Sequence, residues 1–302
     1  MRIYFRGNLY GCNQATAFVE DKGKIIFIGS DKEALKYSGE QIDLNNKYVY
    51  PGFNDSHMHL VNYGQSLKNV LLEKHTNSLK ALLEELKKHL VKGQWLIGRG
   101  WNHDYFTDEQ RFPTRKDLDM ISEEEPIVIT RTCGHILVAN SKAIELANIT
   151  SEAVEGGYFD LDAGLFQENA LYLIYDTIPQ PTIEEIKDNI LIAQKELHSY
   201  GITFVQSDDL LSATSDYHDA LQAFEQLRAE NKLTIRVYEQ AQLPTLKALK
   251  EFINLGYCTG SGDEFFKIGP LKMLGDGSLG ARTAFLSKPY YDAPKTRGIP
   301  VF

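Results

Sequence analysis

The sequence has few of the features that mark secreted, membrane-bound or disulfide-rich proteins. Its 302 residues include only three cysteines, Cys12, Cys133 and Cys258, and no CxxC spacing. This pattern argues against a disulfide framework and against a cysteine-ligated zinc site. No stretch approaches the ~18 consecutive apolar residues of a membrane helix, and the first residues carry no apolar signal segment. We therefore expect a protein of the reduced cytoplasm without a membrane partner.

Positive charge is also scarce. The chain has 32 Lys and Arg residues against 41 Asp and Glu residues, a formal net charge of −9. This balance argues against a nucleic-acid partner, because non-specific binding needs a basic surface. Hydrophobic residues make up 43% of the chain and charged residues 24%, close to the average for globular proteins. Disorder, collagen-like repeats and a coiled coil are excluded as descriptions of the whole chain.

The pattern of apolar residues changes near Pro51. Before it, short β-branched and aromatic runs alternate with Gly and Asn turns, which predicts a small β unit over residues 1–50. After it, strands alternate with amphipathic helices, such as those predicted over 78–92 and 182–200. From residue 182 onward, this alternation is typical of a parallel sheet or a (β/α) barrel. The predicted core strands cover residues 48–56, 202–207, 233–240 and 265–273.

The sharpest chemical signal is a pair of histidines at the end of the first of these strands. His57 and His59 stand in the stretch PGFNDSHMHL, residues 51–60. In an extended chain, side chains at i and i+2 point to the same face. Imidazole is a common ligand of Zn²⁺, Ni²⁺ and Fe²⁺, so the pair predicts a metal site with Asp55 orienting one ring. Two ordinary half-buried histidines are the alternative.

A second signal is Lys272, at the end of the last predicted strand and just before a glycine-rich stretch, residues 275–280. The lysine could instead lie along the surface. The glycine-rich stretch could form a nest of backbone N–H groups that binds an anion, or a plain tight loop. It lacks a following Lys-Ser/Thr pair and is therefore not a P-loop.

The histidine stretch resembles the first-strand signature of the amidohydrolase superfamily, metal-dependent hydrolases on a (β/α)₈ TIM barrel. Further stretches are similar to its amidohydrolase family 3 branch, which includes N-substituted formamide deformylases. These stretches are residues 98–102, 131–135, 140–143 and 272–283. The resemblance implies hydrolysis of a C–N bond in an amide-like small molecule by a metal-activated water.

The resemblance also implies the residues of the site. One or two divalent ions, zinc foremost, would be held by His57, His59 and a carbamylated Lys272. His135 is implied to contact the substrate or polarise the transition state, although the residues alone leave a structural role equally open. Substrate-binding residues are implied at Trp101 (expected in a loop), Asn140, Glu168 and Asp276.

The resemblance finally implies an incomplete barrel. The family takes two further histidines and an aspartate base from later strands, but no histidine follows Lys272. We expect a β-sandwich piece over 1–50 and a partial barrel over 51–302, truncated after about four strands, with an inserted α/β subdomain at about 61–200. The inward faces of Val205, Val237 and Ile268 should lack partners until a second chain or a further segment covers them. A non-catalytic fragment or binding module is the alternative function.

Overall fold

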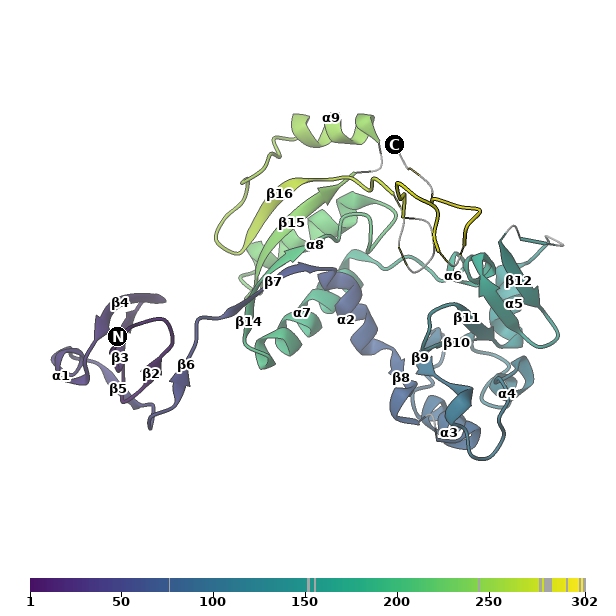
Figure 1. Cartoon of the computed structure of the whole chain (residues 1–302), viewed down its shortest axis with the longest axis horizontal. Coiled ribbons are helices and arrows are strands. Elements are labelled where there is room, and N and C mark those ends of the chain that lie inside the picture. Colours follow the sequence, from purple (N-terminus) through teal and green to yellow (C-terminus); the bar gives the residue numbers. More distant parts are fainter. Residues whose placement is uncertain are drawn as a thin grey trace. The chain divides into compact units, whose positions relative to one another are not determined.

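The computed structural model describes residues 1–75, 77–150, 153–154, 156–243, 245–276, 279, 284–291, 293–298 and 300 (Figure 1). The chain divides into two compact units, which are described separately. The first comprises Met1–Asn54 with Gly201–Phe204, and the second comprises Asp55–Tyr200 with Val205–Phe302. Within the described residues, no helix has the length and apolar character needed to cross a membrane.

The first unit is a small β structure. A four-stranded sheet has the order β4-β3-β1-β5, and a two-stranded parallel sheet pairs β2 with β6. The elements are β1 (Arg2–Phe5), β2 (Asn8–Leu9), β3 (Ala17–Asp21), β4 (Lys24–Gly29), α1 (Asp31–Ala34), β5 (Glu40–Asp43) and β6 (Tyr48–Val49). Its core holds only Ile3, Ala17, Val19 and Ala34 with two partly buried phenylalanines. The predicted short strands are present, and the β-sandwich stays a prediction.

The centre of the second unit is a four-stranded sheet of order β16-β15-β14-β7. Its elements are β7 (Phe53–Met58), α2 (Leu60–Lys68), α7 (Ile183–Ser199), β14 (Ile202–Ser207), α8 (Tyr217–Ala229), β15 (Arg236–Gln242), α9 (Leu246–Asn254) and β16 (Phe266–Lys272). Strands adjacent along the chain are adjacent in the sheet, and helices separate them, as in a (β/α) barrel. Among the described residues the sheet stays open and closes no barrel.

One face of this sheet is packed against helices. Val205, Val237 and Ile268 are at most 2% exposed. The Phe224 ring of α8 stacks on Phe266 of β16 with the ring centroids 4.8 Å apart. The alternating positions on the other face, Gln206, Tyr238 and Gln240, are partly exposed. The expectation that Val205, Val237 and Ile268 point inward without partners is therefore wrong, because all three side chains are buried within the structure.

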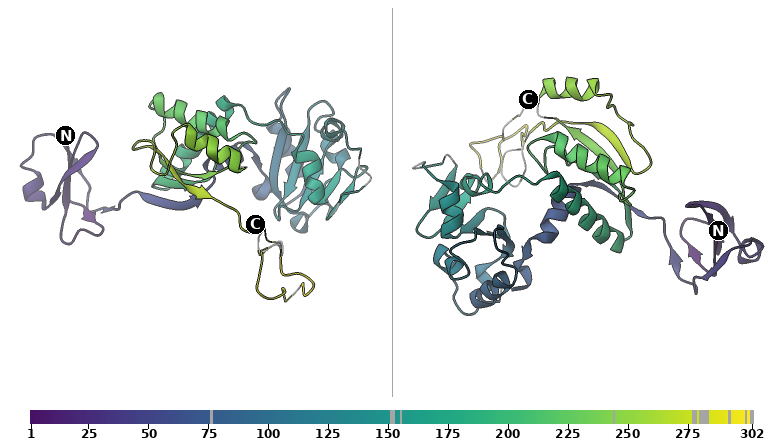
Figure 2. Two further views of the ribbon diagram at one scale, coloured as in Figure 1. Left: turned by 90° about the horizontal axis from the view of Figure 1, so that it is seen from above. Right: turned by 180° about the vertical axis from the view of Figure 1, so that it is seen from behind.

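Between α2 and α7 the chain forms a lobe around a six-stranded sheet of order β12-β13-β11-β10-β9-β8 (Figures 1 and 2). Its strands are β8 (Val70–Leu71), β9 (Leu96–Trp101), β10 (Ile127–Arg131), β11 (Ile136–Ala139), β12 (Gly157–Asp160) and β13 (Leu165–Glu168). Its helices are η1 (Leu72–His75), α3 (Leu79–Lys88), η2 (His103–Tyr105), α4 (Arg115–Asp119), α5 (Ser141–Ala147), η3 (Asn169–Leu171) and α6 (Tyr172–Tyr175). Separate apolar clusters form on α3 with α4 and on α5 with α6.

Hydroxyl side chains start the two longest predicted helices, as their sequences indicate. The Ser78 hydroxyl accepts a hydrogen bond from the Ala81 N–H at 2.9 Å and so caps α3. Thr182 and Glu185 form a capping box at the start of α7. Helix α3 ends at Lys88, four residues before the predicted end, whereas α7 ends one residue before its predicted end.

Candidate functional site

Polar side chains gather at the carboxyl ends of the four central strands. Because parallel strands deliver their carboxyl ends to one edge of a sheet, this edge is where a (β/α) fold places its active site. The residues concerned are His57 and His59 around the end of β7, Ser207, Asp208 and Asp209 after β14, Glu239 in β15 and Lys272 at the end of β16. We call this set the strand-end cluster.

The two histidine rings lie together, as their i and i+2 spacing predicts. Their ring centroids are 5.5 Å apart and the ring planes meet at 74°. His57 belongs to β7, whereas His59 is the extended residue directly before α2. Asp55, predicted to orient a ring, instead accepts a hydrogen bond from the backbone N–H of His57 at 3.1 Å.

A backbone carbonyl fixes the protonation of the His59 ring. The Nδ1 atom lies 2.6 Å from the carbonyl oxygen of Asp208 and 3.0 Å from the Ser212 hydroxyl. Since a carbonyl oxygen can only accept a hydrogen bond, Nδ1 carries the hydrogen. The lone pair of the neutral ring is then on Nε2, which leaves this nitrogen available to a metal ion.

Lys272 reaches the same cluster. Its ammonium group forms an ion pair with Oδ2 of Asp208, whose side chain is buried. Lys272 thus contacts the side chain of Asp208, and His59 contacts its carbonyl. The other carboxylate oxygen of Asp208, Oδ1, is buried without a hydrogen-bond partner in the described part of the chain. A buried carboxylate oxygen without a partner is rare in folded proteins and marks this position for a closer look at its surroundings.

Two more carboxyl groups are buried beside these residues. Burial raises the pKa of Asp209 to about 6, although hydrogen bonds from the Ser207 hydroxyl and the Val61 N–H favour its charged form. Burial, followed by the nearby Asp209 charge, raises the pKa of Glu239 well above its ordinary value. Oε2 of Glu239 is buried and has no partner among the described residues.

The predicted ligands could hold a divalent ion only if the two histidines are joined by a different type of ligand. Across the described residues, no three His, Cys, Asp or Glu side chains are placed to share a metal ion. His57 and His59 therefore need a ligand of another type. The sequence predicts Lys272 as this further ligand. Lys272 and His59 both contact Asp208, which brings them to the same place.

His135 and Glu168 are also brought together, in the lobe sheet. The His135 Nδ1 lies 2.9 Å from Oε2 of Glu168, and both side chains are more than half exposed. The backbones pair too, because the Glu168 N–H donates to the His135 carbonyl. Glu168 has φ +53°, in a region that non-glycine residues rarely adopt. The two side chains form an exposed hydrogen-bonded pair, and their catalytic and substrate-binding roles stay predictions.

Trp101 and Asn140 occupy the interior of the lobe. Trp101 ends β9 and is fully buried, so the expected loop position is wrong. The Asn140 side chain caps α5 and uses its full hydrogen-bonding capacity. Its oxygen accepts from the Ile127 and Ala143 N–H groups, and its NH₂ donates to the Ser122 and Glu125 carbonyls. Both side chains are fully buried, and the substrate contacts predicted for them stay predictions.

The glycine-rich stretch after β16 is only partly described. Asp276 is exposed and accepts a hydrogen bond from the Phe285 N–H at 2.8 Å. Gly277, Ser278 and Gly280 lie outside the described residues. The predicted anion-binding loop over 275–280 and the substrate contact of Asp276 therefore stay predictions.

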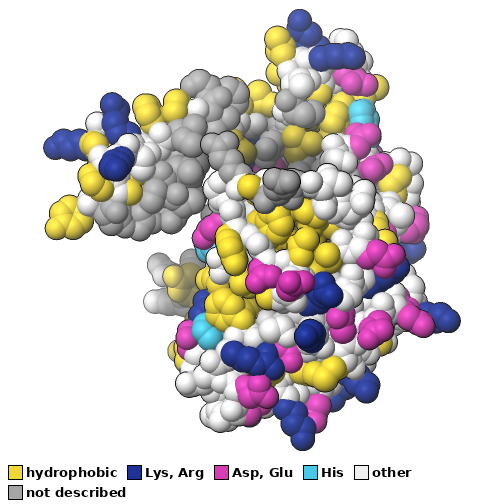
Figure 3. All heavy atoms as spheres, turned by 90° about the vertical axis from the view of Figure 1, so that its right-hand side faces the viewer, with side chains coloured by type: hydrophobic (Ala, Val, Ile, Leu, Met, Phe, Trp, Pro, Cys, Tyr) yellow, Lys and Arg dark blue, Asp and Glu magenta, His cyan; other side chains and the backbone are white. Residues whose placement is uncertain are grey.

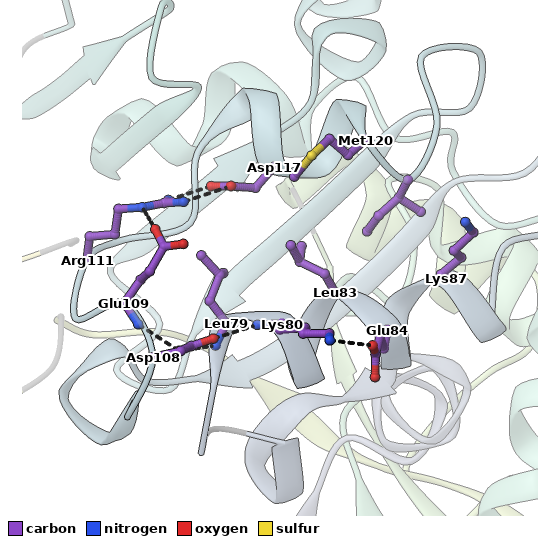
Figure 4. Close-up of a pocket in the computed structure, with 11 residues that line it drawn as sticks. Leu79, Lys80, Leu83, Glu84, Lys87, Asp108, Glu109, Arg111, Asp117 and Met120 are labelled. Carbon is purple, nitrogen blue, oxygen red and sulfur yellow. Dashed lines mark hydrogen bonds and ion pairs between the residues drawn. The ribbon is translucent and has the colours of Figure 1, made fainter.

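The lobe contains a cavity of about 320 Å³ that shares no residue with the strand-end cluster (Figure 4). Helix α3, helix α4 and the segment 108–112 line it. Most of its charged side chains are paired with each other, including Arg111 with Asp117 and Lys80 with Glu84. Figure 3 shows the outer surface of the lobe, where acidic and basic side chains alternate with small apolar patches.

Sequence reasoning missed four members of the strand-end cluster, namely Ser207 and the three acidic residues Asp208, Asp209 and Glu239. A signal for the three acidic residues exists. Two aspartates follow directly after the strand 202–207, and a glutamate interrupts the apolar alternation of the strand 233–240. Charged residues at buried strand positions are rare unless they are paired or functional, which would have marked all three.

The sheet order and the alternation of strands with helices define an α/β protein of the (β/α) class. A sequence profile described as "Amidohydrolase family" matches residues 40–302, and the chain belongs to this family, in its family 3 branch.

Individual relatives agree with this assignment. YtcJ of Bacillus subtilis (strain 168) is 32% identical over 304 residues, covering 96% of this chain and 56% of its own length. N-substituted formamide deformylase of Arthrobacter pascens is 30% identical over 157 residues, covering 49% of this chain and 29% of its own length. The crystal structure of an uncharacterized metal-dependent hydrolase from Pyrococcus horikoshii OT3 superposes with TM-score 0.78 and 33% identity, covering 100% of this chain and 60% of that chain. The chain thus spans little more than half of its full-length relatives.

Proposed function

We propose that the strand-end cluster binds a divalent metal ion in a hydrolase that cleaves a C–N bond of an amide-like small molecule. The observation that carries the proposal is the His57–His59 pair, with His59 held so that Nε2 is free. The family and the metal-dependent hydrolase of Pyrococcus horikoshii, similar along the whole chain, support it.

The proposal assigns a metal-binding role to each of three residues. His57 and His59 would hold the ion, which, when bound, lowers the pKa of water and polarises a carbonyl. Lys272 would join them as a carbamate. Its ammonium group must first lose a proton; the free amine then forms a C–N bond to CO₂ and releases a second proton. Zinc is the first candidate because two imidazoles and a carboxylate-type oxygen suit it.

We further propose that the four central strands are half of a (β/α)₈ barrel and that the first unit belongs to a β-sandwich. The sequential strand order and the lengths of the relatives support this. The remaining strands would come from a further segment or a second chain. His135, Glu168 and Asp276 are then the residues proposed to meet the substrate.

A binding module without catalysis is the second candidate. The specific observation in its favour is that the described residues place no three His, Cys, Asp or Glu side chains around one point.

Elemental analysis of protein purified without added metal distinguishes the two candidates. The hydrolase proposal expects at least one equivalent of zinc or a similar ion, lost in His57→Ala and kept in the control His135→Ala. Turnover of N-substituted formamides, measured on the same samples, would establish the reaction. Metal-free wild-type protein that stays metal-free with added Zn²⁺ and bicarbonate would favour the binding module.

A further inference from the structure

Helix α2, which follows the second histidine, begins without a cap of its own. The residue at its N-cap position is His59, in an extended conformation, and its side chain makes no capping hydrogen bond. The first N–H groups of any helix lack partners within the helix and must find them elsewhere. The first two of these groups in α2 are the N–H groups of Leu60 and Val61.

The end of the neighbouring strand β14 supplies both partners. The Leu60 N–H donates to the Ser207 hydroxyl oxygen at 2.9 Å, and the Val61 N–H donates to Oδ1 of Asp209 at 2.9 Å. The Ser207 hydroxyl in turn donates to Oδ2 of Asp209 at 2.5 Å. Ser207 and Asp209 are fully buried, so these bonds compete with no bulk water.

The third strand holds this pair in place. The backbone N–H of Asp209 donates to Oε1 of Glu239 at 2.6 Å, which ties the segment after β14 to β15. The same segment carries the Asp208 carbonyl that accepts from His59 Nδ1. One short stretch, 207–209, therefore binds the ring of His59 and also the backbone that directly follows it.

A helix start such as that of α2 is usually capped by the side chain of its own N-cap residue. Ser, Thr, Asp or Asn at position 59 would do so locally, without burying a carboxyl group in a neighbouring strand. The observed arrangement leaves the side chain at position 59 free to point elsewhere. It also fixes the start of α2 to the end of β14 rather than to the side chain of its own N-cap residue.

We propose that Ser207 and Asp209 are positioning residues that fix the His59 imidazole at the strand ends by capping α2 from β14. That the positioned ring serves a metal ion rests on the proposed function. The positioning itself can be tested without metal or activity, because it predicts one neutral tautomer of His59.

The experiment compares Ser207→Ala with a matched control, Thr245→Ala. Thr245 also caps a helix with its hydroxyl, accepting from the Ala248 N–H at the start of α9, and within the described residues it forms no hydrogen bond with the strand-end cluster. The first readout is the tautomer of His59 in long-range ¹H–¹⁵N NMR spectra of the metal-free full chain, assigned with His59→Gln. The second is Zn²⁺ affinity by titration calorimetry.

We expect Nδ1–H alone in the wild type and in Thr245→Ala, and a shift toward Nε2–H in Ser207→Ala. Zn²⁺ affinity should fall about 10- to 100-fold in Ser207→Ala and stay unchanged in the control, as for other residues that support metal-binding histidines. If Ser207→Ala does not fold, Asp209→Asn, which keeps the shape of the side chain, should move both readouts the same way.

An unchanged tautomer and unchanged Zn²⁺ affinity in a folded Ser207→Ala protein would overturn the proposal. So would a wild-type His59 with mixed tautomers. If the wild type binds no Zn²⁺ but its His59 tautomer is fixed and depends on Ser207, the positioning holds and the proposed metal function fails. The two failures are therefore distinguishable.

Discussion

The strand-end cluster and the lobe cavity both bury aspartates, and they compensate the charge differently. In the lobe, burial raises the pKa of Asp117, but hydrogen bonds from Arg111 and Thr114 outweigh it and lower the pKa below its ordinary value. The Arg111 guanidinium contacts both carboxylate oxygens, at 2.6 and 2.9 Å. At the strand ends, burial dominates and raises the pKa of Asp209 to about 6.

The difference separates a structural pair from a candidate active site. The Asp117 carboxylate pairs with the Arg111 cation and accepts hydrogen bonds from the N–H and the hydroxyl of Thr114 in the capping box of α4. Both of its oxygens therefore have partners. Asp208 and Glu239 each keep one buried oxygen without a partner in the described part of the chain. Buried polar atoms without partners lower stability, and they occur preferentially at functional sites. This favours the strand ends, not the lobe cavity, as the place of chemistry.

The largest stability effect is expected in the lobe, for a residue first predicted to bind substrate. Trp101→Ala should lower the free energy of unfolding by about 3–5 kcal/mol, because it empties a fully buried position. Urea denaturation of the wild type and the variant measures this loss. Trp101→Phe should cost less, since the Trp101 indole N–H has no partner to lose among the described residues. An unchanged free energy of unfolding in Trp101→Ala would show that Trp101 does not contribute to the stability of the core.

The next largest effect is a dependence of stability on pH that arises from Asp209 at the strand ends. An aspartate with an ordinary pKa near 3.9 in the unfolded chain and about 6 in the folded chain binds its proton more tightly when folded. Stability should therefore fall as the pH rises from about 4 to about 6, by about 3 kcal/mol from this group.

Asp209→Asn should remove this fall. Chemical denaturation of the wild type and of Asp209→Asn at several pH values measures it, because carboxyl groups remote from Asp209 titrate equally in both proteins. Glu239, whose pKa the Asp209 charge raises, contributes to the measured difference. A difference between the two proteins that is constant from pH 4 to pH 6 would show that Asp209 titrates normally.

The Arg111–Asp117 pair should give a smaller loss of stability. Arg111→Ala leaves the buried Asp117 carboxylate without its cation and should cost about 2 kcal/mol at pH 7. Lys80→Ala, which removes an exposed ion pair to Glu84, is the matched control and should cost less than about 0.5 kcal/mol. Equal losses in the two variants, measured by thermal unfolding, would show that burial does not strengthen the Arg111 pair.

The smallest effect is expected at the exposed His135–Glu168 pair. Glu168→Gly relieves the positive φ angle and loses an exposed hydrogen bond to His135, and these two effects oppose each other within about 1 kcal/mol. We expect a melting temperature equal to or slightly above that of the wild type. A clear fall in melting temperature would mean that the pair stabilises the lobe.

Local signals predicted much of this fold. Ser78 and Thr182 marked helix starts because a cap depends on a few neighbouring residues. The i and i+2 spacing of His57 and His59 predicted adjacent rings because strand geometry is regular.

The errors arose where the answer depends on distant partners. The burial of Trp101 and the four hydrogen bonds of Asn140 depend on strands and loops remote in sequence. Val205 could be assigned to either face, because alternation gives the period of a strand and not which face meets the helices. The contacts of Ser207 and Asp209 with α2 span nearly 150 residues, so no local pattern indicated them.

The most direct test of the central claim is an anomalous difference map from crystals of the chain grown with Zn²⁺ and bicarbonate. We predict a peak at the strand ends, with Nε2 of His57 and of His59 at about 2.0–2.1 Å and extra density on Nζ of Lys272. A zinc peak between His135 and Glu168, or at the lobe cavity, with none near His57 and His59, would contradict the account.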